Sequence, residues 1–322
     1  MLSADPIVTE LLTRTLSAIS SGSRRLVVWG TDSIGLQFLS GLNALGFLPL
    51  VCGLVDHRRE TQGRTLFGLQ IMPPESLREV ALDTVIITFD KEKEVALELI
   101  SSDDTRIPHL IFAGNANYEF TDPVFDGIVS SCPVKSKAGG YPSMLIHLYQ
   151  CLKHISERKI SGDVAEFGVF QGGTTVFMAK VLKHFGNDGR VYGFDTFQGF
   201  PAASHVLDAY ADEKCQFPDY DTVRNYCAPY NIELVRGDIR ETYQTLSNVN
   251  LALTFFDTDN YSATKKALEF CAERTALGGF VAFDHYFSPG WSQTVGERIA
   301  ARQVLGEMNF LNLHGTGIFI KQ

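Results

Sequence analysis

Apolar runs alternate with segments of helical periodicity along most of the chain. In the first third, apolar residues recur at helical spacing between positions 8 and 19 and again over 34–47, which predicts two helices. Short apolar runs bounded by glycine and polar residues predict strands between and after them. These strands are expected at 24–30, 49–56, 84–89 and 109–113. Strands that alternate with helices indicate a parallel, doubly wound sheet.

The same alternation returns in the second half. Apolar residues at helical spacing predict a helix over 143–158. Further strands are expected at 163–167, 190–194, 232–236, 251–256 and 279–283. The chain closes with two β-like runs joined by residues 314–317, which predicts a C-terminal antiparallel hairpin.

Residues 114–143 are rich in glycine, proline and asparagine, which is typical of a connector. The apolar residues within this connector need burial, and we expect them to pack on the second unit. The sequence therefore predicts an α/β protein with two doubly wound, Rossmann-like domains, residues 1–120 and 121–322.

Composition narrows the class of protein. Of the 322 residues, 45% are hydrophobic and 20% charged, which is typical of a soluble globular protein, and no apolar run approaches the length of a membrane span. The net charge of −9 argues against a nucleic-acid or anionic-membrane partner. The six cysteines form no CxxC pair, so we expect reduced thiols, and the N-terminus lacks the layout of a secretory signal. We therefore expect a cytoplasmic protein, and we expect it to be a homo-oligomer.

Acidic residues stand at the ends of three predicted strands in the second domain, at Glu166, Asp195 and Asp238. Ligands of open α/β sheets bind along this edge, where glycine-rich turns bring a helix N-terminus close to them. Glu166 would balance the ammonium and sulfonium charges of S-adenosylmethionine, Asp195 would accept its ribose hydroxyls, and Asp238 its adenine amino group. We predict that the cofactor is held by Glu166, Gly168, Gly172, Gly173, Thr174, Asp195, Thr196, Gly237 and Asp238.

A second group of ligands follows the last two parallel strands. Asp257 and Asp259 come directly after 251–256, and Asp284 and His285 come after 279–283. A divalent cation at these residues would lower the pKa of an acceptor hydroxyl and fix its direction. Hard carboxylate oxygens suit magnesium, whereas an imidazole ligand would shift the preference toward manganese. Alternatively, His285 is the general base and no metal is present.

Four motifs resemble one family. EFGVFQGGTT, FDTFQGFP, FFDTDNYSATKKAL and GGFVAFDHY are similar to the macrocin O-methyltransferase family, and the likeness extends over about residues 140–322. This resemblance implies a class I methyltransferase fold, S-adenosylmethionine as donor, magnesium, and a hydroxyl acceptor on a small natural product or sugar. By the same resemblance, Asp257 and Asp284 match metal ligands and Asp259 matches the general base. The family has a second acid where this chain has His285.

The first domain carries an altered dinucleotide fingerprint. Residues 30–35 read GTDSIG at a strand-to-helix turn, and Asp56 ends the next predicted strand. The middle glycine, which would contact a pyrophosphate, is replaced by Asp32, so NAD binding is disfavoured. Residues 55–77 resemble the small Rossmann-like domains attached to enzymes that modify sugar nucleotides.

The acceptor side is less defined. Tyr286, Phe287 and Trp291 are candidates for an aromatic wall or for core anchors, Tyr141 for closing over the ligand, and 202–230 for a lid. The alternatives to an O-methyltransferase are an N-methyltransferase without metal, an NAD-dependent enzyme that uses the first domain, and a partner that binds the donor without catalysis.

Overall fold

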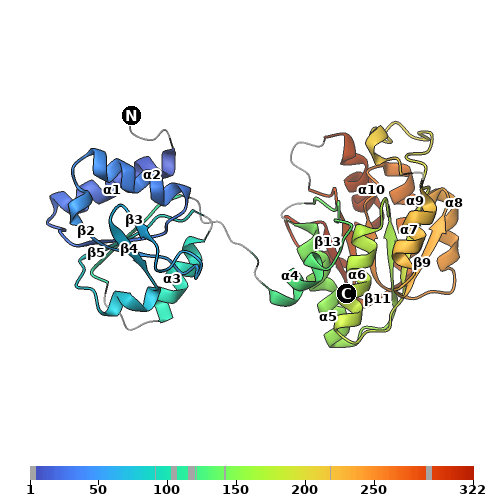
Figure 1. Ribbon diagram of the computed structural model, residues 1–322. Coiled ribbons are helices and arrows are strands. Elements are labelled where there is room, and N and C mark those ends of the chain that lie inside the picture. Colours follow the sequence, from blue (N-terminus) through green and yellow to red (C-terminus); the bar gives the residue numbers. More distant parts are fainter. Residues whose placement is uncertain are drawn as a thin grey trace. The chain divides into compact units, whose positions relative to one another are not determined.

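The computed structural model describes residues 5–90, 92–102, 107–114, 120, 122–140, 143–217, 219–287 and 292–322. The chain forms two compact units, Met1–Phe120 and Thr121–Gln322 (Figure 1). Among the helices of the described residues, none combines the length and the apolar character that crossing a bilayer requires. All six cysteines are free thiols, as the sequence indicated.

The first unit contains a mixed sheet with strand order β3-β4-β2-β1-β5-β6. β1 pairs in parallel with β2 and β5, whereas β3 and β4 form an antiparallel pair at one edge. Its elements are α1 (Pro6–Ser20), β1 (Leu26–Trp29), α2 (Ser33–Ala44), η1 (Leu48–Leu50), β2 (Val51–Val55), β3 (Thr65–Leu66), β4 (Leu69–Met72), η2 (Pro74–Arg78), β5 (Thr84–Ile87), α3 (Lys93–Ser102) and β6 (His109–Phe112). β3 and β4 were not expected from the sequence. Phe67 and Gly68 join them in a two-residue turn with positive φ at both positions, which matches the twist of a hairpin.

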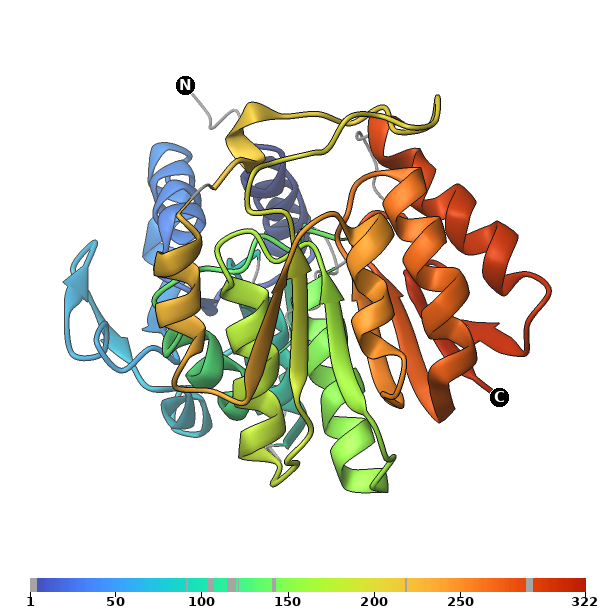
Figure 2. The same cartoon turned by 90° about the vertical axis from the view of Figure 1, so that its right-hand side faces the viewer.

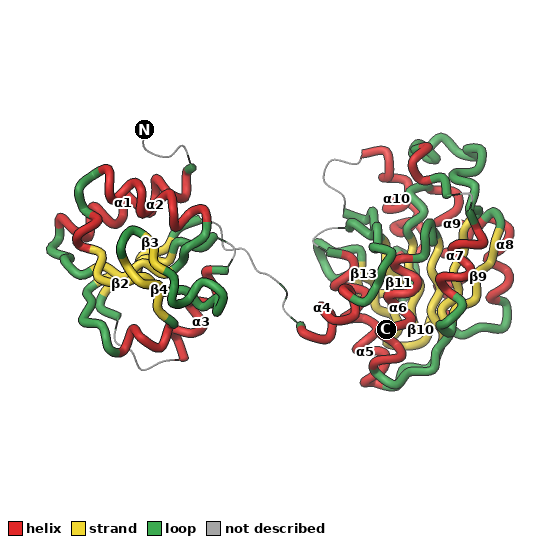
Figure 3. Tube along the Cα trace, in the orientation of Figure 1, coloured by secondary structure: helices red, strands yellow, loops and turns green. Residues whose placement is uncertain are grey.

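The second unit contains a sheet with strand order β12-β13-β11-β10-β7-β8-β9. β9, β8, β7, β10 and β11 are parallel, and β13 pairs antiparallel with β11 and with β12. Figure 2 shows that the parallel strands end at one edge, and Figure 3 shows helices beside the strands of this sheet. Its elements are α4 (Pro123–Ser130), α5 (Met144–Arg158), β7 (Asp163–Phe167), α6 (Gly173–His184), β8 (Val191–Asp195), η3 (Glu213–Cys215), α7 (Tyr220–Cys227), β9 (Ile232–Arg236), α8 (Ile239–Thr242), η4 (Tyr243–Leu246), β10 (Leu251–Phe256), α9 (Tyr261–Arg274), β11 (Thr275–Phe283), η5 (Ser292–Thr294), α10 (Val295–Leu305), β12 (Phe310–Asn312) and β13 (Ile318–Lys321).

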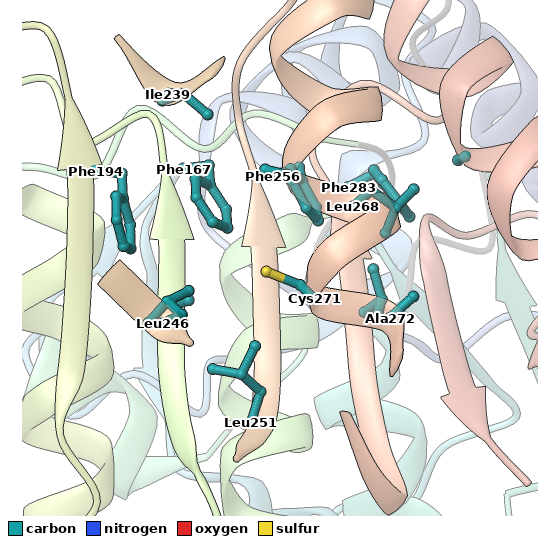
Figure 4. Close-up of a cluster of buried hydrophobic side chains, with 14 of the residues drawn as sticks. Phe167, Phe194, Ile239, Leu246, Leu251, Phe256, Leu268, Cys271, Ala272 and Phe283 are labelled. Carbon is teal, nitrogen blue, oxygen red and sulfur yellow. The ribbon is translucent and has the colours of Figure 1, made fainter. Parts of the chain in front are cut away.

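A row of buried phenylalanines crosses the central strands near their carboxyl ends (Figure 4). Phe167 of β7 stacks on Phe194 of β8 with ring centroids 4.7 Å apart and on Phe256 of β10 at 5.0 Å. Phe256 in turn stacks on Phe283 of β11 at 5.2 Å. Because successive residues of a strand point to opposite faces, each phenylalanine packs into the core while the next residue begins the edge of the sheet. That next residue is an aspartate after three of the four phenylalanines.

The segment between the two units packs on the second one, as the sequence indicated. Phe125 of α4 contacts the rings of Tyr149 and Phe177, with centroids 5.4 and 5.9 Å away. Further along, a Cβ at Gly173 would lie 2.5 Å from the carbonyl oxygen of Lys135. The connector therefore lies directly on the start of α6, and glycine is needed there for that close approach of two backbones.

Candidate active site

A cavity of about 1000 Å³ lies at the carboxyl edge of the second sheet. It is bordered by the loops that follow the five parallel strands, by part of the connector, and by a segment after β8. We call this segment, residues 199–217, the strap. The predicted site residues that line the cavity are Gly168, Asp195, Thr196, Asp238, Asp257, Asp259, Asp284 and His285.

Asp284 is held by the connector. Its Oδ1 accepts the N–H of Gly140 at 2.8 Å, and its Oδ2 accepts the N–H of Gly139 at 3.1 Å. A Cβ at Gly140 would lie 2.4 Å from the carbonyl oxygen of Asp284, so the connector approaches as closely as a backbone can. Burial raises the pKa of Asp284, although His285 and these two N–H groups oppose the shift.

Asp259 and His285 form an ion pair at the centre of the site. His285 Nε2 lies 2.8 Å from Asp259 Oδ1, 3.3 Å from Asp284 Oδ2 and 3.8 Å from Asp257 Oδ1. Burial lowers the pKa of His285, but the hydrogen bond to Asp259 and the surrounding carboxylates outweigh it and raise the pKa to about 9. The imidazole therefore carries a proton near neutral pH, which makes it a poor general base there. Asp259 has a φ of 60°, an uncommon backbone conformation for a residue with a side chain.

The cluster offers a set of metal ligands. One ligand atom each of Asp257, Asp259 and His285 lies within 4.8 Å of the others. Burial, together with Asp284 and Asp259, raises the pKa of Asp257 well above its ordinary value, because several carboxylates share one space. A divalent cation fits such a set, because it would relieve the repulsion among the carboxylates. The imidazole would have to release its proton to bind it.

Glu166 is enclosed beneath the cavity. Its side chain is 1% exposed, its Oε2 accepts the hydroxyl of Thr175, and its Oε1 has no partner among the described residues. Burial raises the pKa of Glu166 to about 8; the bond from Thr175 opposes this shift and the charge of Asp195 adds to it. A buried carboxyl with one unpaired oxygen fits a cationic group, which would favour its ionised form.

Asp195 organises the loop that follows β7. Its Oδ2 accepts the N–H groups of Val169 and Phe170 at 2.9 and 2.8 Å, and its Oδ1 accepts the N–H of Phe197 at 2.7 Å. An ionised carboxylate has about four acceptor positions. Asp195 therefore retains the capacity to accept a hydroxyl from a ligand in the cavity that it lines.

The remaining predicted cofactor residues have structural partners. Thr174 shares a hydrogen bond with Ser136 of the connector, and Thr196 donates to the carbonyl oxygen of Gly199. Asp238 caps α8 and is paired with Arg240, whose guanidinium helps to lower its pKa against the effect of burial. Gly168, Gly172 and Gly237 all have positive φ. Glu166, Gly172, Gly173, Thr174 and Gly237 are not among the described residues that border the cavity.

The strap is fastened beside the Asp257, Asp259 and His285 cluster. Asn260 accepts the N–H of Tyr210 at 3.1 Å and donates to its carbonyl oxygen at 3.0 Å. Asp208 of the strap accepts the N–H and the hydroxyl of Ser262, at 2.8 and 2.7 Å. Residues that directly follow Asp259 therefore hold one wall of the cavity. Tyr210 and Cys215 of the strap face this cavity.

Of the predicted aromatic residues, Tyr286 packs against Phe319 of the core, with ring centroids 5.2 Å apart. This contact favours the core-anchor interpretation for Tyr286. Phe287 is 42% exposed. Tyr141 and Trp291 lie outside the described residues.

Glu297 belongs to the site and was not found from the sequence. It is 0% exposed, and its Oε1 accepts the backbone N–H of His285 at 3.0 Å. Helical periodicity could have identified it, because Glu297 falls in phase with the buried Ala300, Ala301 and Leu305 of α10. An acid on the apolar face of a helix is an unusual feature.

In the first unit, the two acids of the altered dinucleotide fingerprint are engaged within the protein. Asp32 caps α2 by accepting the N–H groups of Ile34 and Gly35. Asp56 is fully buried and lies 2.7 Å from Arg58, and the hydroxyl of Thr31 donates to it at 2.6 Å. Burial alone would raise the pKa of Asp56, but these hydrogen bonds lower it. The carboxylate that a ribose would use is thus already paired.

Residues 142–321, more than half of the chain, match the model of the macrocin-O-methyltransferase (TylF) family. The chain belongs to this family. The recognition made from the four motifs is thereby confirmed, and the family is one of enzymes, methyltransferases.

Two relatives carry related names. The chain is 30% identical over 168 residues to mycinamicin III 3''-O-methyltransferase of Micromonospora griseorubida, a match that covers 48% of this chain and 66% of that protein. It is 27% identical over 187 residues to demethyldecarbamoylnovobiocin O-methyltransferase of Streptomyces niveus, covering 53% and 71%. The crystal structure of CalS11, a calicheamicin methyltransferase, aligns with a TM-score of 0.47 at 22% identity, covering 65% of this chain and 98% of that one. The matched segments thus span about two thirds of the two relatives.

Proposed function

We propose that this protein is an S-adenosylmethionine-dependent O-methyltransferase that acts on a hydroxyl of a sugar or natural product. The observation that carries the proposal is one cavity that brings together Asp195 after β8 and the Asp257, Asp259 and His285 cluster after β10 and β11. Family membership and the names of the relatives support the reaction class and the kind of acceptor. Residues 121–322 would be the methyltransferase domain.

The proposed donor site lies on the β7 and β8 side of the cavity. Asp195 would accept the ribose hydroxyls, and Glu166, whose Oε1 lacks a partner in the described part of the chain, would balance the positive charge of the donor. We also propose that the donor contacts Asp238 and the glycine-rich turn at Gly168, Gly172 and Gly173. Asp238 would first have to share its carboxylate with Arg240.

The proposed chemistry is an in-line displacement. The acceptor oxygen forms a bond to the methyl carbon, the bond from that carbon to the sulfonium breaks, and the acceptor proton passes to Asp259. A divalent cation at Asp257, Asp284 and His285 would lower the pKa of the acceptor hydroxyl when bound. The chain's own contribution is to hold these ligands in place and to direct the acceptor toward Asp259. The protonated state of His285 in the metal-free site favours Asp259 over His285 as the base.

The alternatives make different use of the structure. An N-methyltransferase would have no need of a carboxylate cluster that binds metal. An NAD-dependent enzyme would need Asp56, which is buried and paired with Arg58. We therefore propose that residues 1–120 form a Rossmann-like domain that holds no ligand through a ribose on Asp56.

Calorimetry and a product assay test the proposal. Purified protein should bind S-adenosylmethionine and not NAD. The substitution Asp195→Asn should weaken the affinity for S-adenosylmethionine at least tenfold. With mycinamicin III and demethyldecarbamoylnovobiocin as acceptor probes, formation of S-adenosylhomocysteine should require Mg²⁺ or Mn²⁺ and stop in EDTA. Wild-type protein that gives no heat with the donor would overturn the proposal. Methyl transfer that EDTA leaves unchanged would remove the metal from it.

A further inference from the structure

Glu297 lies behind the cluster, in the first turn of α10. Its side chain is 0% exposed, and its Oε1 accepts the backbone N–H of His285 at 3.0 Å. Its Oε2 is buried and has no hydrogen-bond partner among the residues that the structure describes. Arg298, the next residue, places Nη1 3.5 Å from the carbonyl oxygen of Tyr286, a long contact on the same stretch of backbone.

A carboxyl group in this position is unfavourable by itself. Burial raises the pKa of Glu297 to about 8; His285 opposes this shift, whereas Asp259 and Asp284 add to it. An unpaired buried polar atom destabilises the folded protein. Among the described residues, the backbone N–H of His285 makes the one hydrogen bond to this side chain. A role for Glu297 would therefore act through that hydrogen bond.

The backbone of His285 decides where its imidazole lies. Asp284, the preceding residue, is fixed by the N–H groups of Gly139 and Gly140. Glu297 accepts the N–H of His285 itself, in the peptide unit that joins His285 to Asp284. With both held, His285 Nε2 lies 2.8 Å from Asp259 Oδ1. Without Glu297, the backbone N–H of His285 would lose this acceptor, and the backbone that carries the imidazole would be held less firmly against the aspartates.

We propose that Glu297 is a positioning residue that holds the imidazole of His285 against Asp259 through the backbone of His285. The proposal rests on the proposed function, in which this cluster binds the metal and takes the acceptor proton. In this proposal, Glu297 acts as a hydrogen-bond acceptor, and its negative charge is not required. Groups behind metal ligands commonly change metal affinity by about 10- to 100-fold when removed.

Three variants separate these contributions. Glu297→Gln keeps an oxygen for the N–H of His285 and removes the ionisable group, whereas Glu297→Leu removes both. Glu307→Leu, at an exposed position just after the same helix, controls for loss of an acid. The chain has eight histidines, so ¹⁵N-histidine labelling gives a simple spectrum, and His285→Asn assigns the signal of His285. Mn²⁺ affinity and S-adenosylhomocysteine affinity, measured by calorimetry, complete the set.

In the metal-free wild type, the Nε2–H of His285 should give a slowly exchanging signal because it is bonded to Asp259. Glu297→Gln and Glu307→Leu should keep that signal, with Mn²⁺ affinity within about twofold of wild type. Glu297→Leu should lose the signal and weaken Mn²⁺ binding at least tenfold, with S-adenosylhomocysteine affinity within about twofold.

A folded Glu297→Leu protein that keeps the signal would overturn the proposal. So would a Glu297→Gln protein that loses it, and this second test holds even if the leucine variant does not fold. The imidazole signal is measured without a methyl acceptor and without turnover. A wild-type protein that methylates nothing would therefore count against the proposed function and leave this test intact.

Discussion

Glu166 makes the proposed donor site sensitive to protons. In the donor-free protein its carboxyl is buried, one of its oxygens has no partner among the described residues, and burial raises its pKa to about 8. Near neutral pH it is therefore mostly protonated. A sulfonium or ammonium beside it would favour the carboxylate, so binding the donor should release a proton. The perturbation that tests this is Glu166→Gln, which mimics the protonated form and cannot release one.

The expected size of the effect follows from that pKa. With a pKa of about 8, about 0.9 of the molecules hold this proton at pH 7, so complete ionisation would release about 0.9 proton per donor bound. The rise in the pKa of Glu166 from 4.5 to about 8 corresponds to at most about 5 kcal/mol of unfolding free energy in the donor-free protein. Because the folded pKa is raised, this stability is present below pH 4.5 and is lost as pH rises to about 8.

Calorimetry in two buffers of different ionisation enthalpy measures the released protons directly. The wild type should release about 0.9 proton more than Glu166→Gln at pH 7, and the difference should shrink as pH rises past 8. Titration of the donor's own amino group affects both proteins equally and cancels. Glu157→Gln, an exposed change on α5, should behave as wild type.

Equal proton release by wild type and Glu166→Gln would refute this reasoning. The same holds if the glutamine variant binds the donor as tightly as wild type at pH 9, where the carboxylate should be ionised and attractive. Stability provides an independent check without donor. Relative to Glu166→Gln, the wild type should lose unfolding free energy between pH 5 and pH 8, and a constant difference would contradict the raised pKa.

Three further predictions concern the acceptor side. Asp259→Asn should leave the calorimetric donor affinity within about twofold and lower turnover by about 10²- to 10⁴-fold, so an equal loss of donor binding would contradict a role as base. Gly140→Ala should lower the melting temperature, because its Cβ would lie 2.4 Å from a backbone oxygen at a cost of about 1–3 kcal/mol. The control Gly127→Ala, in α4 with open space at its Cβ, should not lower it. Asn260→Ala removes two hydrogen bonds to the strap and should speed amide exchange there, while an unchanged rate would show that other contacts hold it.

The central parallel strands could be predicted because apolar runs such as that of β10 need burial on both faces. The sequence placed strands at the positions of β7, β8, β9, β10 and β11, and the structure has them there. The β3–β4 hairpin was missed because strands of this length carry little periodicity of their own. Its turn, Phe67-Gly68, is the one local signal, and a glycine after an aromatic residue is a weak one.

The candidate site was predictable where chain order alone decides geometry. The residues that follow parallel strands must meet at one edge, so Asp195, Asp257 and Asp284 could be grouped before any coordinates were known. The connector's grip on Asp284 could not be foreseen, because Gly139 and Gly140 act through backbone N–H groups that no residue type reveals. The internal pairing of Asp238 was equally hidden, because a strand-end acid caps a helix and binds a ligand by the same chemistry.

The order of the strands explains why the two halves of the proposed reaction meet. β7 lies between β8, which ends in Asp195, and β10, which is followed by Asp257. Neighbouring strands are about 4.8 Å apart, so the donor acid and the acceptor cluster begin about 10 Å from each other, on either side of β7. The loop between them starts at Gly168, where a Cβ would lie 2.1 Å from the carbonyl oxygen of Asp257. Glycine at position 168 lets the loop after β7 touch the loop after β10. A larger residue there should therefore weaken the binding of the methyl donor and of the acceptor together.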